Sequence, residues 1–165
     1  MRSTEGPIAL SQSDGALIME GTATAEAPTL RAQVVSRQSY AERDFHEEVQ
    51  LLADTTGIDG NYFLDFFMHS GSGNLHVGLS CRQNLSGSPG GYVTNASCAP
   101  VVGQGEVPVQ YTVPPFLGTL LTVRFSYHAA TTTFDVEIPE LHLDLRDVSA
   151  GPKHPLQIIS IGLMA

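Results

Sequence analysis

The chain has little charge of either sign, and positive charge is especially scarce. Only 15% of its 165 residues are charged, and eight basic against seventeen acidic residues give a formal net charge of −9. Lysine occurs once, at Lys153. A surface this acidic repels the phosphates of nucleic acids and the headgroups of anionic lipids. We therefore expect no nucleic-acid partner and no docking on an anionic membrane.

Long apolar runs are absent too. No stretch approaches the about 20 consecutive apolar residues of a membrane-spanning helix, and residues 1–10 lack the apolar core of a secretion signal. We therefore expect no membrane insertion and no leader within this sequence. Hydrophobic residues nevertheless make up 42% of the chain, which is enough to bury one core and is not typical of a disordered protein.

Cysteine is limited to Cys81 and Cys98, which allow one disulfide at most. The two residues bracket a segment with two N-x-S sequons, which begin at Asn84 and Asn95. One interpretation is a cross-linked, glycosylated extracellular loop. The other is a pair of small free thiols beside chance sequons. Because two cysteines are weak evidence for a disulfide, we favour free thiols.

Signatures of catalysis and of cofactor binding are missing as well. The sequence contains no G-x-S-x-G, Walker or dinucleotide-binding fingerprint, no H-E-x-x-H helix and no D-x-D-x-D-G loop. Gly71-Ser72-Gly73 precedes a predicted strand, so it cannot place a helix N-terminus on a phosphate. We therefore expect a protein that is not an enzyme and that needs neither a cofactor nor a metal.

Three pairs of polar residues have spacings that also occur in functional sites: Asp135 with Glu137, His142 with Asp144, and His69 with His76. The first pair would lie about 7 Å apart on one strand face, a separation at which two carboxylates can hydrolyse glycosides. The second would hold a divalent ion only with a third ligand, which no motif supplies. The third flanks a predicted turn, where two imidazoles can form a pH-sensitive or metal-binding pair. For each pair we favour a solvated polar face or loop end.

Turn-forming residues are plentiful, with sixteen glycines and ten prolines, and apolar residues alternate with polar ones between them. The clearest alternation lies in Thr119–Ile138, on both sides of the polar link His128–Thr131. Its apolar positions are Leu121, Val123, Phe125, Tyr127, Phe134, Val136 and Ile138. A period of two predicts two strands that each bury one face, joined as a β-hairpin.

Similar patterns predict further strands at intervals of about eight to twelve residues, the rhythm of a β-sandwich. They are expected at Pro7–Leu10, Ala16–Met19, Leu30–Val35, Tyr62–His69, Leu75–Cys81, Tyr92–Ala96, Val107–Val113, Leu141–Arg146 and Leu156–Leu163. The sequence therefore predicts an all-β fold, an antiparallel β-sandwich or jelly roll with at most one short helix. We expect a single domain over residues 7–165, and residues 1–6 read as a tail or a cloning remnant.

The segment Ser39–Asp54 departs from this rhythm. Ser39-Tyr40-Ala41-Glu42 has the form of a capping box, and apolar residues follow at helical spacing. We favour a helix here. A strand is the alternative, with Phe45, Val49 and Leu51 facing inward and His46, Glu48 and Gln50 facing outward.

Two resemblances to known families follow from these patterns. The segment Gly118–Ala165, with the strands LTVRFSY, TTTFDVEI and IISIGLM, resembles the end of a concanavalin-like or laminin-G-like sandwich. Glucanases of that superfamily carry an E-x-D-x-x-E strand, but here the nearest run is Asp135-Val136-Glu137-Ile138-Pro139-Glu140. The resemblance therefore implies the fold and not the glucanase activity.

The second resemblance is to the heads of trimeric viral attachment fibres of the adenovirus and reovirus type. Pro7–Ser11, a turn, and Gly15–Ile18 are similar to one repeat of the shafts that precede such heads. In those proteins a β-sandwich head follows the shaft directly, and the chain often ends in a buried strand. This likeness implies a homotrimer on a virion surface or in another extracellular setting, whose head binds a cell-surface protein or glycan.

Both resemblances favour recognition over catalysis, with the variable residues in loops. In the predicted Gln83–Ala96 loop, Asn84, Tyr92 and Asn95 are the candidates to hydrogen-bond or stack on a sugar. We therefore expect a non-enzymatic attachment module, the receptor- or glycan-binding head of a virion fibre. The alternatives are a monomeric lectin-like carbohydrate-binding module and a structural or decoration subunit of a larger assembly.

Overall fold

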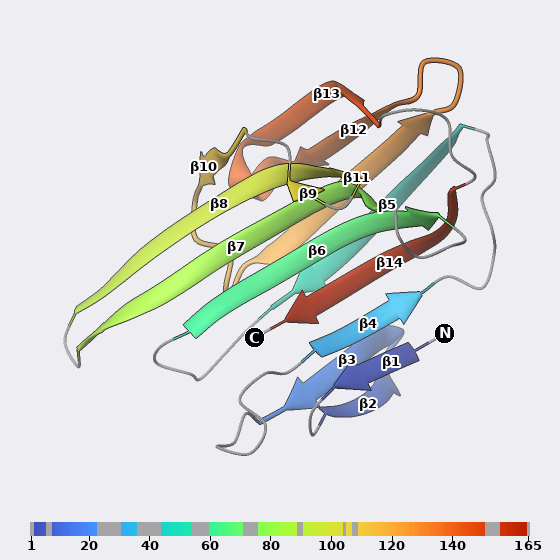
Figure 1. The fold of residues 1–165 in the computed structure, drawn as a ribbon. Helices are drawn as coiled ribbons and strands as arrows, with labels where there is room; N and C mark the ends of the chain where they lie inside the picture. Colours follow the sequence, from blue (N-terminus) through green and yellow to red (C-terminus); the bar gives the residue numbers. More distant parts are fainter. Residues whose placement is uncertain are drawn as a thin grey trace.

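Antiparallel strands make up most of the described chain in the computed structural model (Figure 1). The structure describes residues 2–5, 8–22, 31–35, 44–53, 60–70, 76–88, 91–103, 105–106, 109–150 and 156–164. Within these residues the helical structure is limited to one short 3₁₀ turn, η1 (Pro139–Leu141). No helix in this part of the chain has the length and apolar character needed to cross a membrane. The predicted all-β sandwich is confirmed.

The strands form two large sheets and one hairpin. The eight-stranded sheet has the order β1 (Arg2–Glu5), β4 (Arg31–Val35), β14 (Leu156–Met164), β6 (Gly60–Ser70), β7 (His76–Ser88), β8 (Gly91–Gly103) and β10 (Tyr111–Val113), with β9 (Gly105–Glu106) paired to β8. The four-stranded sheet has the order β13 (Leu143–Ser149), β12 (Thr133–Ile138), β11 (Leu120–His128) and β5 (Phe45–Leu52). The separate hairpin consists of β2 (Ile8–Ser13) and β3 (Ala16–Gly21), which pair with each other and with no other described strand.

Pairing of β11 with β12 confirms the predicted hairpin in Thr119–Ile138. The alternating apolar side chains of both strands are buried and enter one core with residues of β7, β8 and β10. Phe125 stacks between Phe45 and Phe134, with ring centroids 5.9 and 5.6 Å away. The core therefore lies between the four-stranded sheet and the β7–β8–β10 part of the larger sheet.

The segment Phe45–Leu52 is a strand, so the favoured helix is wrong for these residues. Its side chains alternate between half-buried and exposed, as the strand interpretation of this segment required. β5 pairs with β11 over eight residues, from Phe45 opposite Tyr127 to Leu52 opposite Leu120. This pairing satisfies the backbone and packs the half-buried Phe45 against the core, and tertiary contacts of this kind override a local helix preference. The capping-box residues 39–42 lie outside the described chain.

Arg2–Glu5 also differ from expectation, because they form β1 and pair with β4 instead of forming a tail. The reason is that backbone pairing at the edge of a sheet requires no apolar side chain. A polar sequence such as RSTE suits an edge position, where it discourages further strand addition. Alternation of apolar residues, the signal on which the sequence analysis depended, is absent from such a strand.

The third correction concerns β7 and β8, which continue through most of the predicted Gln83–Ala96 loop. The strands pair over thirteen residues each, from His76 opposite Gly103 to Ser88 opposite Gly91. Cys81 lies opposite Cys98 in this register, and the two form a buried disulfide with a Cα–Cα distance of 4.0 Å. The prediction of free thiols is therefore wrong. Direct opposition across the two strands is what brings the sulfurs together, and it could not be seen while the segment read as a loop.

Gln83 joins the two sheets at the point where the chain crosses from one to the other. Its side chain is 2% exposed, and its Oε1 accepts hydrogen bonds from the backbone N–H groups of Phe116 (2.6 Å) and Leu117 (2.9 Å). These two residues lie in the crossing segment between β10 and β11. One residue further on, Gly118 N–H donates to the carbonyl of Ala53, at the end of β5.

Substitution of Gln83 by methionine should destabilise the protein strongly, because the variant keeps the volume but leaves two buried N–H groups without an acceptor. We expect the free energy of unfolding to fall by about 2–4 kcal/mol, measured by urea denaturation. Gln50→Met, at an exposed position of β5, is the matched control and should change stability by less than about 0.5 kcal/mol. Equal urea midpoints for the two variants would contradict this role of Gln83.

Removal of the disulfide should also cost stability. The bridge closes a loop with a sequence separation of 17, and in the chain-entropy account a loop of this size contributes about 3 kcal/mol. We expect Cys81→Ala/Cys98→Ala to lower the free energy of unfolding by that amount. The wild-type protein, unfolded without reductant, should show no reactive thiol in a thiol-titration assay. Two reactive thiols before reduction would show that the bridge does not form.

Candidate functional site

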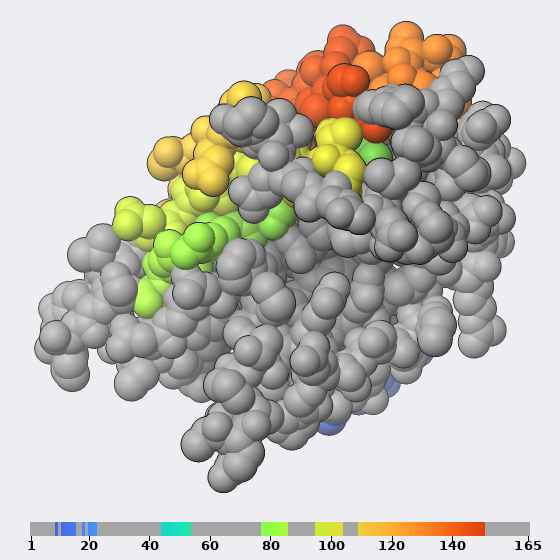
Figure 2. Space-filling model, in the orientation of Figure 1, coloured from blue at the N-terminus to red at the C-terminus, as the bar shows by residue number. Residues whose placement is uncertain are grey.

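The outer face of β7, β8 and β10 carries hydrogen-bonding side chains that alternate with the buried core residues. We call Arg82, Asn84, Asn95, Ser97 and Thr112 the amide face. Arg82, Asn95 and Thr112 are exposed, and the other two are half-buried. Atoms of β7 and β8 reach the surface in the view of Figure 2. The face forms because odd-numbered residues of β7 and even-numbered residues of β8 point into the core, which leaves the intervening positions outside.

Strand register aligns this set in two rows. Asn84 lies opposite Asn95, and Arg82 lies opposite Ser97, which in turn lies opposite Thr112. Arg82 Nε donates a hydrogen bond to Asn84 Oδ1 at 2.9 Å. This bond orients the Asn84 amide so that its NH₂ group points away from the guanidinium. Two of the three predicted contact residues, Asn84 and Asn95, are therefore neighbours, although on paired strands and not in a loop.

Tyr92, the third predicted contact residue, lies near the tip of the hairpin that β7 and β8 form. It pairs with Gly87, beyond the row formed by Asn84 and Asn95. Tyr92 precedes Asn95 by three positions along β8. The structure does not bring Tyr92 together with the two asparagines.

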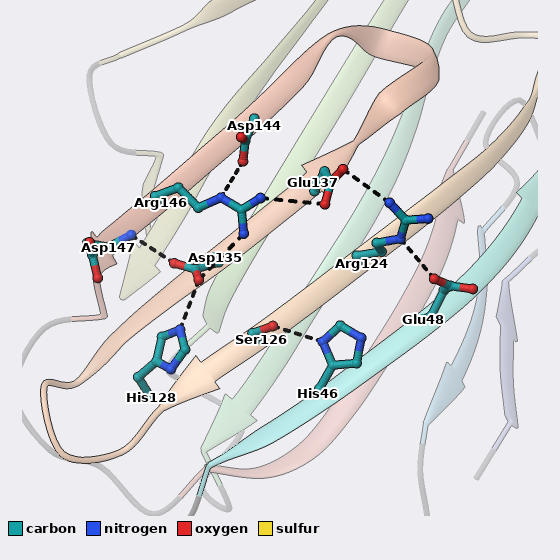
Figure 3. A network of polar contacts seen from close by, with 10 residues as sticks. All are labelled: His46, Glu48, Arg124, Ser126, His128, Asp135, Glu137, Asp144, Arg146 and Asp147. Carbon is teal, nitrogen blue, oxygen red and sulfur yellow. Dashed lines mark hydrogen bonds and ion pairs between the residues drawn. The ribbon is translucent and has the colours of Figure 1, made fainter.

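The outer face of the four-stranded sheet carries charge instead. Figure 3 shows its polar side chains, which we call the charged face: His46, Glu48, Arg124, Ser126, His128, Asp135, Glu137, Asp144, Arg146 and Asp147. Arg124 bridges Glu48 at 2.8 Å and Glu137 at 3.1 Å. Arg146 pairs with Asp144 at 2.5 Å and with Glu137 at 3.5 Å. The two guanidinium groups on this face therefore pair with Glu48, Glu137 and Asp144 and offset part of the negative charge.

Asp135 occupies a β-bulge between β12 and β13. Phe134 pairs with Val148 and Val136 with Leu145, so that Arg146 and Asp147 together oppose Asp135. Asp147 has a φ of 52°, and its backbone N–H donates to Asp135 Oδ1 at 2.8 Å. The other carboxylate oxygen lies 2.9 Å from His128 Nε2 and 3.8 Å from Arg146.

These contacts shift two pKa values in opposite directions. The hydrogen bond to Asp135 raises the pKa of His128 above its ordinary value and outweighs desolvation, which acts the other way. Desolvation alone would raise the pKa of Asp135. Hydrogen bonds from His128 and from the Asp147 N–H, together with the nearby charges, lower it below its ordinary value instead.

Asp135 and Glu137 share one face, as the sequence predicts, but their partners do not suit acid–base chemistry. A glycosidase needs one carboxylic acid with a raised pKa. The pKa of Asp135 is lowered, and Glu137 is paired with two arginines. This arrangement favours the interpretation of the pair as a polar sheet face.

A hydrogen bond that the sequence did not suggest joins His46 Nδ1 and Ser126 Oγ at 2.9 Å. A serine and a histidine at this distance are the beginning of a nucleophile–base pair. Ser126, however, lies within a strand paired on both sides, with β5 and β12, so the surrounding N–H groups serve the sheet. The backbone N–H groups of this strand segment are thus engaged in the sheet and are not arranged as an oxyanion hole.

The structure places the two candidate metal-binding pairs, His142 with Asp144 and His69 with His76, differently. His142 ends η1 in the left-handed region, with a φ of 52°, and so lies outside β13, the strand that holds Asp144. His69 and His76 are direct register partners at the end of β6 and β7. Among the residues that the structure describes, no group of three histidine, cysteine or acidic side chains is placed to hold a metal ion.

No protein-family model matches this chain, and a search of curated proteins finds no significant relative. The two exposed faces of the described sheets are therefore the surfaces from which a function is inferred below. Sequence reasoning identified Asn84 and Asn95 through their sequons but missed Arg82, Ser97 and Thr112. Continued alternation between Cys81 and Cys98, had it been read through the polar residues, would have placed Arg82 and Asn84 on one face of the first strand and Asn95 and Ser97 on one face of the second.

Stability should depend on pH through His128 and Asp135. His128 binds its proton more tightly in the folded state, so its contribution is complete below pH 6.5 and is lost as pH rises through the folded pKa. The contribution of Asp135 is present above pH 3.8 and is lost as pH falls through its folded pKa. We expect His128→Gln to lower the urea midpoint at pH 5 and to approach the wild type near pH 9.

The control for this prediction is the same substitution in an Asp135→Asn background. There the pH-dependent part of the difference should shrink, because the main partner of the imidazolium is gone. A His128→Gln effect of equal size at both pH values would show that the side chain contributes no charge-dependent stability.

Proposed function

We propose that the chain is a non-enzymatic recognition module that presents the amide face to a ligand outside the cell. The observation that carries this proposal is the alignment of Asn84 and Asn95 on an exposed sheet face. The disulfide between Cys81 and Cys98 holds the two strands together, so the face is fixed before a ligand arrives. A preorganised surface loses less conformational entropy on binding than a flexible loop does.

Two further observations support an extracellular recognition role over catalysis. A structural disulfide is typical of proteins that mature in an oxidising compartment. The charged face, where acid–base residues gather, consists largely of ion pairs that satisfy one another. Neither feature is needed by a cytosolic enzyme, and both suit a stable binding domain.

Within this class we propose the head of a trimeric attachment fibre, such as those on virions. The hairpin of β2 and β3 pairs with neither large sheet in the described chain. A two-stranded hairpin by itself is marginally stable in water. Three copies around a shared axis would supply one another's missing contacts, as the resemblance of this segment to a fibre-shaft repeat implies. A monomeric lectin-like module is the alternative, and oligomeric state distinguishes the two.

Light scattering on the whole chain should give a molar mass three times the 17.6 kDa of one chain. We also expect the species to resist dissociation on an unheated denaturing gel. A Leu10→Asp substitution in β2 should lower the molar mass toward that of one chain, whereas Gln50→Asp on β5 should not. A wild-type protein with the mass of one chain would overturn the fibre-head proposal and leave the lectin-like module.

Recognition itself is tested by binding of the labelled protein to intact animal and bacterial cells. Saturable binding that unlabelled protein displaces is the expected result. Its absence, together with absence of binding to a broad panel of glycans, would overturn the recognition function.

A further inference from the structure

The amide face is nearly uncharged, although the chain carries a net charge of −9. Its described side chains include one cation, Arg82, and no carboxylate. The charged face, by contrast, holds Glu48, Asp135, Glu137 and Asp144. The nearest acidic register position to the amide face is Asp65 on β6, which lies opposite Ser80. Charge is thus distributed unevenly between the amide face and the charged face.

The chemistry of this face matches sugar hydroxyl groups. A side-chain amide offers two donors and an acceptor, and a hydroxyl group both donates and accepts. Asn84 and Asn95 lie directly opposite each other, which puts their Cβ atoms about 5 Å apart. Two amides at this spacing can engage separate hydroxyl groups of one sugar ring. Ser97 and Thr112, in the neighbouring row with Arg82, add two hydroxyl groups.

Arg82 fixes the orientation of the Asn84 side-chain amide. Because its Nε donates to Asn84 Oδ1, the Asn84 NH₂ group is turned toward Asn95 or solvent, where it can donate to a ligand. An asparagine that is free to flip would present donor and acceptor in either order. The held orientation favours hydroxyl oxygens that accept at this position.

We propose that the amide face binds neutral glycans through Asn84 and Asn95, an inference that rests on the recognition function proposed above. Acidic glycans are the less suitable class, because the net charge of −9 repels sulfate and carboxylate groups at long range. Arg82 offers little compensation, since its Nε already serves Asn84.

The described part of the amide face has no aromatic platform for a sugar ring. Tyr111 lies opposite the core residue Cys98 and so takes the inward position of the pleat at the sheet edge. Binding must depend on hydrogen bonds, each of which gains little because water competes for the same groups. We therefore expect weak binding by one site, with a Kd of about 1 mM, and a strong gain when several sites act together.

The test compares two substitutions of equal charge. Asn84→Asp replaces the NH₂ donors with a carboxylate oxygen, keeps the shape of the side chain and leaves Arg82 a good partner. Gln50→Glu makes the same chemical change at an exposed position of β5, on the other sheet. Both proteins are produced in a bacterial periplasm, which allows the disulfide to form and adds no glycan to the sequons.

The measurement is binding to an array of neutral and acidic glycans, followed by saturation-transfer NMR with the neutral oligosaccharide that binds best. We expect Asn84→Asp to reduce the signal by at least about tenfold, which corresponds to loss of one good hydrogen bond and repulsion of its acceptor. Gln50→Glu should match the wild type. Asn95→Asp, at an exposed position, provides a second variant should Asn84→Asp fail to fold.

Three results would overturn the inference and leave the recognition function standing. They are neutral-glycan binding that both asparagine variants retain, binding confined to sialylated or sulfated glycans, and saturable binding to cells with no binding to any glycan. Absence of binding to both cells and glycans would remove the recognition function and the glycan site together.

Discussion

The hydrogen bonds from the crossing segment to Gln83 determine how the two sheets meet. A sandwich needs its chain to pass from one sheet to the other, and a passage through the core leaves backbone N–H groups away from water. A single amide oxygen accepts from both Phe116 and Leu117, so the crossing is held without an unsatisfied donor. The position of β11, and of the sheet it organises, follows from this contact. With Gly118 bonded to Ala53, the same segment also fixes the end of β5.

The two outer faces differ in the side chains that their strands turn outward. On the four-stranded sheet, acidic and basic side chains alternate across the strands, and Arg124 lies between Glu48 and Glu137 in register. Exposed ion pairs of this kind contribute little stability each, but they leave few charges available to a ligand. On the larger sheet the described outward positions hold amides and hydroxyls instead. The amide face, with Arg82 as its one described charge, therefore offers hydrogen-bonding groups to a partner, which is the basis of the recognition and glycan proposals.

Strands that bury one face could be predicted from the sequence. Strands without an alternating apolar pattern could not. Leu121 to Tyr127 alternate so regularly that β11 could be read directly, and its hairpin with β12 followed. β1 contains no apolar residue, so it shows no alternating pattern. The outer part of β7 is rich in serine, glycine and asparagine, which usually indicate turns. The segment of β5 also has apolar residues at helical spacing, and this pattern favoured a helix over the strand that forms. For the site, Asn84 and Asn95 were identifiable as residues, but their opposition depends on strand register, which spacing alone does not give.

The bulge that Asp135 occupies has a consequence for the solubility of the protein. β13 is an edge strand of its sheet, and a regular edge offers a row of free N–H and C=O groups on which another chain can add a strand. The extra residue at Arg146–Asp147 interrupts that row and increases the local twist. At the opposite edge, β5 turns the charged side chain of Glu47 toward the interior side of the sheet. Both edges thus resist the open-ended addition of strands from other chains that leads to aggregation.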